Sequence, residues 1–267
     1  MALGFGSTAS SRSIHYMNQA KSAMDKSLLK ISSGSRLVSP GDDPGGIAVA
    51  MKLRSSIATN DAAKNRVENA KSYVGMQSST LESASDMIRE MQGLKELYSD
   101  PLKSASEKSA YATQFDELRS QLIGLGSSSI NGQNLFANGN IDVATNSTGS
   151  GTVTLENIDY NNAIAGANFA INDASLDLDG ALDGITSELG KTGSDLSSLG
   201  FASDYLSSTA TNLESALGRI EDVDLAEETA NYAALTLRYE AAAAAVAQAN
   251  ASADTVFNLL MGSLGKD

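Results

Sequence analysis

Apolar residues near the C-terminus recur at alternating steps of three and four positions. This repeat of 3.5 residues is typical of a helix that packs along another helix. The run Ala241–Ala245 strengthens the helical prediction, because alanine has the highest helix propensity. The expected contact positions, named here the C-terminal seam, are Tyr232, Leu235, Tyr239, Ala242, Val246, Ala249, Ala253, Val256 and Leu260. Most of them are small, so we expect this helix, roughly 40 Å long, to pack on a partner helix.

A similar spacing near the N-terminus predicts a first helix. Gly34 is its expected end, since a glycine just past a helix adopts the left-handed conformation at no steric cost. Lys21 takes one position of the repeat. The other positions, named the N-terminal seam, are Ile14, Met17, Met24, Leu28 and Ile31. We expect this seam to be the partner of the C-terminal seam within the chain.

Prolines and glycines break the chain over Ser39–Gly46 and predict a joint between helices. Asp43 before Pro44 is a suitable N-cap followed by proline at the first helical position, so a new helix should begin there. Its apolar heptad positions continue to about Tyr98, and Asp100–Pro101 should close it.

Two more segments carry the same spacing, Tyr111–Leu125 and Leu196–Ile220, and Asn131–Gly132 marks a turn between them. Residues 138–180 differ, being rich in Asn, Gly, Thr and Asp. The alternating pieces Gly151–Leu155 and Asn168–Ile171 predict strands of a small hairpin at the far end of the helices.

The predicted fold is mainly α: an elongated, coiled-coil-like helical bundle built from both chain termini, with a small β-hairpin element in the middle of the chain. We expect an inner terminal-helix domain made of residues 1–40 and 223–267. An outer helical rod domain should comprise 41–137 and 181–222, with 138–180 as its β-rich, irregular tip.

Composition favours a structural protein. The chain has 267 residues with 5% aromatics and no Trp, which indicates a thin core. The absence of Cys excludes disulfides and thiolate catalysis. A net charge of −13 argues against a nucleic-acid partner, and no apolar run is long enough to predict a membrane span. The first residues lack the pattern of a cleaved signal peptide, so we expect any export to use another route.

Three candidate chemical sites each have a simpler interpretation. His15, the single histidine, has no acidic partner near it in the sequence and is better explained as a surface residue than as a catalytic base. Asp177–Gly180 fits a calcium loop poorly, because this chain has Ser175 and Thr186 where the template has its first ligand and its last glutamate; turn and helix-capping aspartates explain it better. Pro40–Gly46 lacks the Lys and Ser/Thr of a phosphate-binding loop. We therefore expect no catalytic, metal or cofactor site.

A set of ordered motifs at both ends of the chain resembles the bacterial flagellins. They are Lys30–Leu37, Gly41–Ala48, Asn131–Leu135, Gly218–Asp222, Glu227–Asn231, Ala247–Asn250 and Phe257–Leu260. The resemblance covers about residues 10–137 and 195–262. It implies a subunit exported unfolded through the flagellar secretion channel and polymerised under a cap into an extracellular helical filament for swimming motility.

The same resemblance implies partners: further copies of the chain, an export chaperone, the filament cap and hook-junction proteins, with no nucleic acid and no membrane. Both seams would then be the assembly interface. A hook–filament junction protein is the alternative, and an enzyme or metal-binding protein is a more distant one. The Ala247–Asn250 stretch favours flagellin.

One stretch departs from the family. Many flagellins read Gln-Arg-Val-Arg-Glu-Leu where this chain has Asp86–Leu94, and that region forms part of the surface recognised by the innate-immune flagellin receptor. Glu90 and Gln92 stand where arginines are usual. Charge reversal replaces attraction with repulsion, so the altered surface, Arg89, Glu90, Gln92 and Leu94, predicts poor detection by that receptor.

Overall fold

A computed structural model of the chain describes residues 2–136, 139–146 and 151–264. The chain divides into two compact units, one formed by residues 1–54 and 214–267 and the other by residues 55–213. The first unit therefore takes in 41–54 and 214–222, which the sequence pattern assigns to the outer rod. Helices dominate both units, as predicted. Among the described residues, none of the helices combines the length and apolarity needed to cross a membrane.

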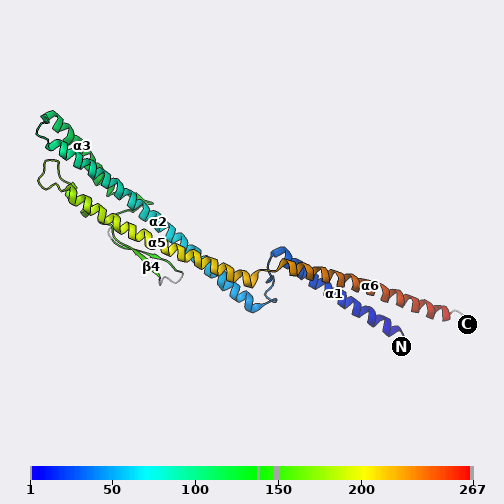
Figure 1. The fold of residues 1–267 in the computed structure, drawn as a ribbon. Coiled ribbons are helices and arrows are strands. Elements are labelled where there is room, and N and C mark those ends of the chain that lie inside the picture. The colour runs from blue at the N-terminus through cyan, green and yellow to red at the C-terminus, as the bar shows by residue number, and fades with distance from the viewer. Residues whose placement is uncertain (1, 137–138, 147–150, 265–267) are drawn as a thin grey trace. The chain divides into compact units, whose positions relative to one another are not determined.

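The first unit is built on two terminal helices, α1 (Ala2–Ser33) and α6 (Leu225–Leu264), which lie side by side (Figure 1). It also holds the start of α2 (Pro44–Ser99) and the end of α5 (Leu178–Glu221). Gly34 has a φ of 70° and ends α1, as expected of a left-handed glycine cap. At the start of α2, the Gly46 N–H donates to the Asp43 carboxylate at 2.9 Å, which confirms Asp43 as the N-cap.

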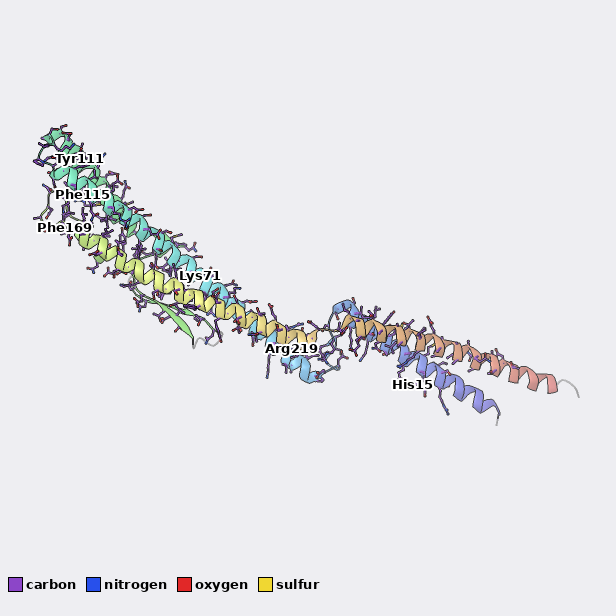
Figure 2. All side chains as sticks on the ribbon, in the orientation of Figure 1. His15, Lys71, Tyr111, Phe115, Phe169 and Arg219 are labelled. Atoms are coloured by element: carbon purple, nitrogen blue, oxygen red, sulfur yellow. The ribbon has the colours of Figure 1, made fainter. Side chains whose placement is uncertain are left out.

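The second unit is built from α2, α3 (Ala105–Leu125) and α5, which pack around two apolar clusters. A capping box begins α3: Ser104 accepts from the Glu107 N–H, and the Glu107 carboxylate accepts from the Ser104 N–H. Figure 2 places Phe115, which is fully buried, close to Tyr111 on α3. Leu81, Ile88 and Met91 line the α2 side of the core.

Two short β-hairpins accompany these helices. Ser129–Ile130 (β1) pairs with Gln133–Asn134 (β2) across Asn131 and Gly132, whose φ values of 50° and 81° are those of a type I′ turn. Ile141–Ala144 (β3) pairs antiparallel with Thr152–Leu155 (β4).

The larger hairpin differs from the expected one. Its first strand is Ile141–Ala144, and Asn168–Ile171 is a turn instead of a strand. The nearer segment pairs because a short connection closes at a lower entropic cost. Nor does the hairpin form the tip. Val143 and Leu155 pack with Val67 and Leu199, so the hairpin covers the side of α2 and α5.

A short connection completes the second unit. It contains α4 (Tyr160–Ala163) and the 3₁₀ turn η1 (Ala165–Ala167), and both contribute to the core. Asp177 then caps α5, since its carboxylate accepts the Gly180 N–H at 2.9 Å. The capping interpretation of Asp177–Gly180 is therefore confirmed.

Candidate assembly surface on the terminal helices

The C-terminal seam faces α1 over most of its length. Leu235 is buried, and Tyr232, Tyr239, Ala242, Val246 and Ala249 are half-buried. Ala253, nearer the chain end, is exposed. The side chains of Val256 and Leu260 lie outside the described residues. Alternating steps of three and four therefore identify the packed face of α6 from Tyr232 to Ala249.

The packed face of α1 has a different register from the predicted one. Six of its buried or half-buried positions recur every three or four residues: Ser13, Met17, Ala20, Met24, Ser27 and Ile31. Ala23 and Lys30, next to two of them, are half-buried as well. Met17, Met24 and Ile31 belong to both spacings. Ile14 and Leu28 lie outside this spacing and are 41% and 50% exposed.

Close approach of the two helices explains this register. Ser27 is 2% exposed, and its hydroxyl donates to the Glu228 carbonyl of α6 at 3.4 Å. The Thr236 hydroxyl also lies 3.7 Å from the Met24 sulfur. Small residues let helix backbones approach each other, so serine and alanine occupy contact positions that larger apolar residues would otherwise take.

Several larger apolar side chains of α1 consequently lie outside the packed face. Ile14, Leu28 and Leu29 are all exposed in this unit. On α6, Leu225 and Leu237 are exposed as well. Apolar side chains clustered on the surface of one unit are typical of a surface that another protein covers.

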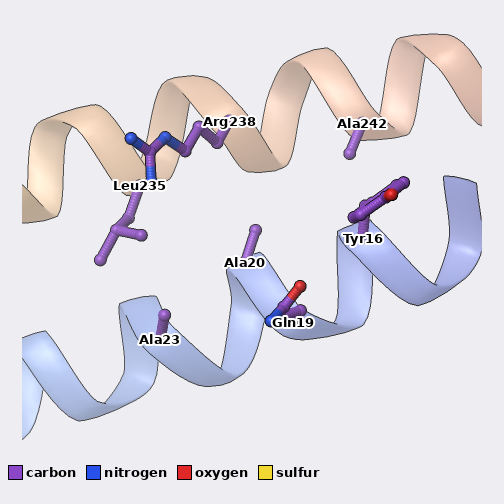
Figure 3. Close-up of a pocket in the computed structure, with 7 residues that line it drawn as sticks. All are labelled: Tyr16, Gln19, Ala20, Ala23, Leu235, Arg238 and Ala242. Carbon is purple, nitrogen blue, oxygen red and sulfur yellow. The ribbon is translucent and has the colours of Figure 1, made fainter.

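Packing between the terminal helices is also incomplete. A cavity of about 450 Å³ lies between them, lined by Tyr16, Gln19, Ala20 and Ala23 of α1 and by Leu235, Arg238 and Ala242 of α6. Figure 3 shows Ala20 and Ala23 pointing toward α6 and Leu235 pointing toward α1. Alanine side chains are too short to fill this space, so the pair buries less apolar surface than two helices with large contact residues.

Backbone and ionic contacts join the two chain ends beyond the helices. The Arg36 N–H donates to the Glu221 carbonyl at 2.6 Å, and the Arg36 guanidinium donates to the Ile220 carbonyl at 2.9 Å. Arg54 pairs with the Glu221 carboxylate at 2.6 Å. The motifs Lys30–Leu37 and Gly218–Asp222 contain most of these residues, but helical periodicity alone gives no sign that they meet.

The Asp86–Leu94 stretch lies on α2 in the second unit. Arg89 and Glu90 are exposed, and Arg89 pairs with Asp86 at 3.0 Å. The Gln92 amide donates to Asp179 of α5 at 2.7 Å. Leu94 is only 9% exposed and belongs to the core. It points inward because it continues the apolar face formed by Ile88 and Met91, so it is not part of an accessible surface.

His15 is exposed on α1, with its ring 6.2 Å from that of Tyr16. It lines a shallow groove with Asn18, Gln19, Ser22, Ala23 and Lys26, none of which carries a carboxylate. Across the described part of the chain, the His, Asp and Glu residues form no cluster of three or more that could hold a metal ion.

Comparison with protein families identifies the chain. A profile of the bacterial flagellin N-terminal helical region matches residues 7–141, and a profile of the C-terminal helical region matches residues 177–260. The chain belongs to the bacterial flagellin family. Flagellin is a structural filament protein, so the expectation of a non-enzymatic function is confirmed. Both flagellin regions are present, and the hook-junction alternative is not favoured.

Similar proteins cover nearly the whole flagellin chain. The flagellar filament 33 kDa core protein of Treponema phagedenis is 26% identical over 89% of this chain and 92% of its own. A flagellin of Halalkalibacterium halodurans is 25% identical, over 91% and 93%. A crystal structure of Bacillus cereus flagellin aligns over 58% of this chain and 88% of its own, with 15% identity and a TM-score of 0.38.

Proposed function

We propose that this flagellin polymerises into the extracellular flagellar filament through its terminal helices. The observation that carries the proposal is the outward position of Ile14, Leu28 and Leu29 on α1. These side chains gain little from the α1–α6 pair and would be buried by neighbouring copies. Together with the two packed seams, they form the proposed assembly interface.

The terminal pair should be only marginally stable in the monomer. About half of its contact residues are small, a cavity lies beside Ala20 and Ala242, and short-side-chain contacts bury little apolar area. Helices gain most of their stability from tertiary packing. We infer that α1 and α6 become fully protected only in the polymer, where binding and ordering are coupled.

Three further partners complete the proposal: an export chaperone, the filament cap and the hook-junction proteins. Each would meet the chain before or during polymerisation. The exposed apolar residues of α1 and α6 are the surface that a chaperone would cover to keep monomers apart.

The test compares polymerisation of wild-type protein with that of Leu28→Asp and Ser22→Asp. Both variants add one negative charge at an exposed position of α1. Leu28→Asp should abolish filaments in electron micrographs, while Ser22→Asp should polymerise. Helix content measured by circular dichroism should be the same in all three monomers. Filaments of normal length from Leu28→Asp would overturn the proposed surface.

Hydrogen exchange tests the coupled ordering. Amides of residues 232–255 should exchange fast in the monomer, because a loosely packed segment opens locally. In the filament, where neighbouring copies pack on the segment, the same amides should exchange about tenfold more slowly or slower still. Equal protection in both states would contradict the proposal.

A further inference from the structure

The second unit carries two exposed aromatic residues on α5. Phe201 is 75% exposed and Tyr205 is 66% exposed. Leu199, Ala202 and Leu206 of the same helix pack toward α2. Each residue turns an α-helix by about 100°, so Phe201 lies roughly 160° around the helix from Leu199. This aromatic pair therefore faces away from α2.

The same unit also contains an apolar pocket, named here the hairpin pocket. It has a volume of about 230 Å³ and lies between α2 and the β-hairpins. Its lining residues are Asn69, Ala70, Tyr73, Gln133, Ile141, Val143 and Leu155. Apart from the amides of Asn69 and Gln133 and the Tyr73 hydroxyl, these side chains present carbon to the pocket.

Hydrogen bonds and buried side chains hold the walls of the pocket in place. The Tyr73 hydroxyl donates to the carbonyls of Asn134 and Leu135, at 3.0 and 3.1 Å, and holds the ring against β2. Val143 and Leu155 are buried in the core beneath. Preformed apolar pockets bind with a smaller ordering cost than flexible ones.

The pocket has the size of one aromatic ring, and a charged residue lies beside it. An apolar cavity of about 150 Å³ holds one benzene molecule, so a pocket of about 230 Å³ accepts one phenyl ring. Arg66 lies on the same stripe of α2 as Asn69, Ala70 and Tyr73, at helical spacing, and is exposed.

Asp204 lies between the two aromatic residues on α5 and is also exposed. Neither Arg66 nor Asp204 makes an ion pair within the described residues. The pocket thus has an unpaired cation beside it, and the aromatic pair has an unpaired anion. Such complementarity favours one orientation of a docked partner.

The two surfaces lie at the same level of the unit. The Ser203 hydroxyl donates to the Glu68 carboxylate at 2.7 Å, which aligns the aromatic pair on α5 with the pocket wall on α2. Contacts between two different patches of identical chains build rings or open helical filaments, and not isologous dimers.

We propose that Phe201 of one copy inserts into the hairpin pocket of a neighbouring copy, with Asp204 beside Arg66 of that neighbour and Tyr205 over Asn69 at the rim. The contact rests on the proposed function, since it joins subunits of the filament. It assigns a lateral interface to the second unit, separate from the terminal helices.

Thiol cross-linking tests the contact directly, because the natural chain has no cysteine. Single variants Tyr205→Cys and Asn69→Cys are each mixed at one part in ten with wild-type protein, polymerised and treated with a short bismaleimide. We expect a covalent dimer only when both variants are present and only in filaments. Ser83→Cys, an exposed α2 position, replaces Asn69→Cys as the control and should give no dimer with Tyr205→Cys.

The outcomes separate the two proposals. Absence of wild-type filaments would overturn the proposed function. Filaments without the mixed dimer, or with dimers from Tyr205→Cys alone, would overturn the lateral contact while leaving the function intact.

A second pair of variants measures the size of the effect. Phe201→Ser should raise the critical concentration for polymerisation about tenfold or more, because one phenyl ring loses its burial. Leu102→Ser, which changes a side chain that is 91% exposed in the turn after α2, should leave it unchanged. Equal critical concentrations for the two variants would count against the contact.

Discussion

The Ser27 hydroxyl of α1 donates to the Glu228 carbonyl of α6 at 3.4 Å, across 201 positions of sequence. Its side chain is 2% exposed, so the two helix backbones come close together at this point. We therefore expect little room for a side chain larger than serine or alanine at this contact.

Ser27→Leu should therefore separate the terminal helices. Inserting extra carbon atoms into a filled contact costs about 1–3 kcal/mol, and the segment around Glu228 should exchange its amides faster. Ser27→Ala loses only a hydrogen bond, about 1 kcal/mol, and provides the matched control. Hydrogen exchange on both monomers measures the difference, and a larger effect of the alanine variant would contradict the close approach.

Val246→Asp should block polymerisation, since it places a charge in the C-terminal seam where the side chain is half-buried against α1. Ala244→Asp adds the same charge at an exposed position of α6 and should retain the α1–α6 pairing in the monomer. Electron microscopy and monomer helix content distinguish the two variants. Normal filaments from Val246→Asp would argue strongly against a packed seam.

Asp195 predicts a pH effect in the second unit. Burial raises the pKa of its carboxyl above the ordinary 3.8, although the Glu156 N–H donates to it at 3.1 Å. A carboxyl with a raised folded-state pKa lowers stability above that pKa, and the loss is recovered as pH falls through it. Asp195→Asn keeps an acceptor and removes the charge.

The midpoint of thermal unfolding measures this effect. Asp195→Asn should unfold at a higher temperature than wild type at pH 7, and the advantage should shrink as the pH approaches 4. An advantage that stays constant with pH would rule out the buried charge as its cause.

Tyr160 ties α4 to the end of α3. Its hydroxyl donates to the Leu122 carbonyl at 2.6 Å, and burial raises its pKa. Tyr160→Phe leaves a buried carbonyl without that donor, a loss of about 1–3 kcal/mol. Denaturant unfolding should show the loss, whereas Tyr205→Phe, at an exposed position of α5, should leave monomer stability unchanged.

Glu90 and Gln92 carry the receptor prediction, which remains our hypothesis. Glu90 is exposed and Gln92 is held by Asp179 at 2.7 Å, so neither presents a cation. Purified monomer should activate innate-receptor reporter cells weakly, and Glu90→Arg with Gln92→Arg should raise activation. Strong activation by the unaltered protein would disprove the hypothesis.

Local signals in the sequence predicted the helices well. Asp43–Pro44 begins α2 and Gly34 ends α1 because caps depend on residues a few positions apart. The register of α1 could not be predicted in this way. Heptad counting favours large apolar residues such as Leu28, whereas the contact itself selects Ser27.

The second unit shows the same limit. The hairpin pocket combines Asn69 and Tyr73 with residues from two hairpins farther along the chain. Their meeting depends on strand pairing, and Ile141–Ala144 is too short for its alternation to stand out. The exposed aromatic pair on α5 has no sequence signature, because its apolar neighbours on the same helix are buried.

The contact between α1 and α6 must form later in folding than the helices themselves. Ser27 and Glu228 are 201 positions apart, so nearly the entire chain must be present before they can meet. Contacts of such long range form late, after the local helices. A chain that emerges with one end first, from a ribosome or from a channel, therefore keeps α1 without its partner until the other end is free. The α1–α6 pair can therefore form only after both ends of the chain have emerged.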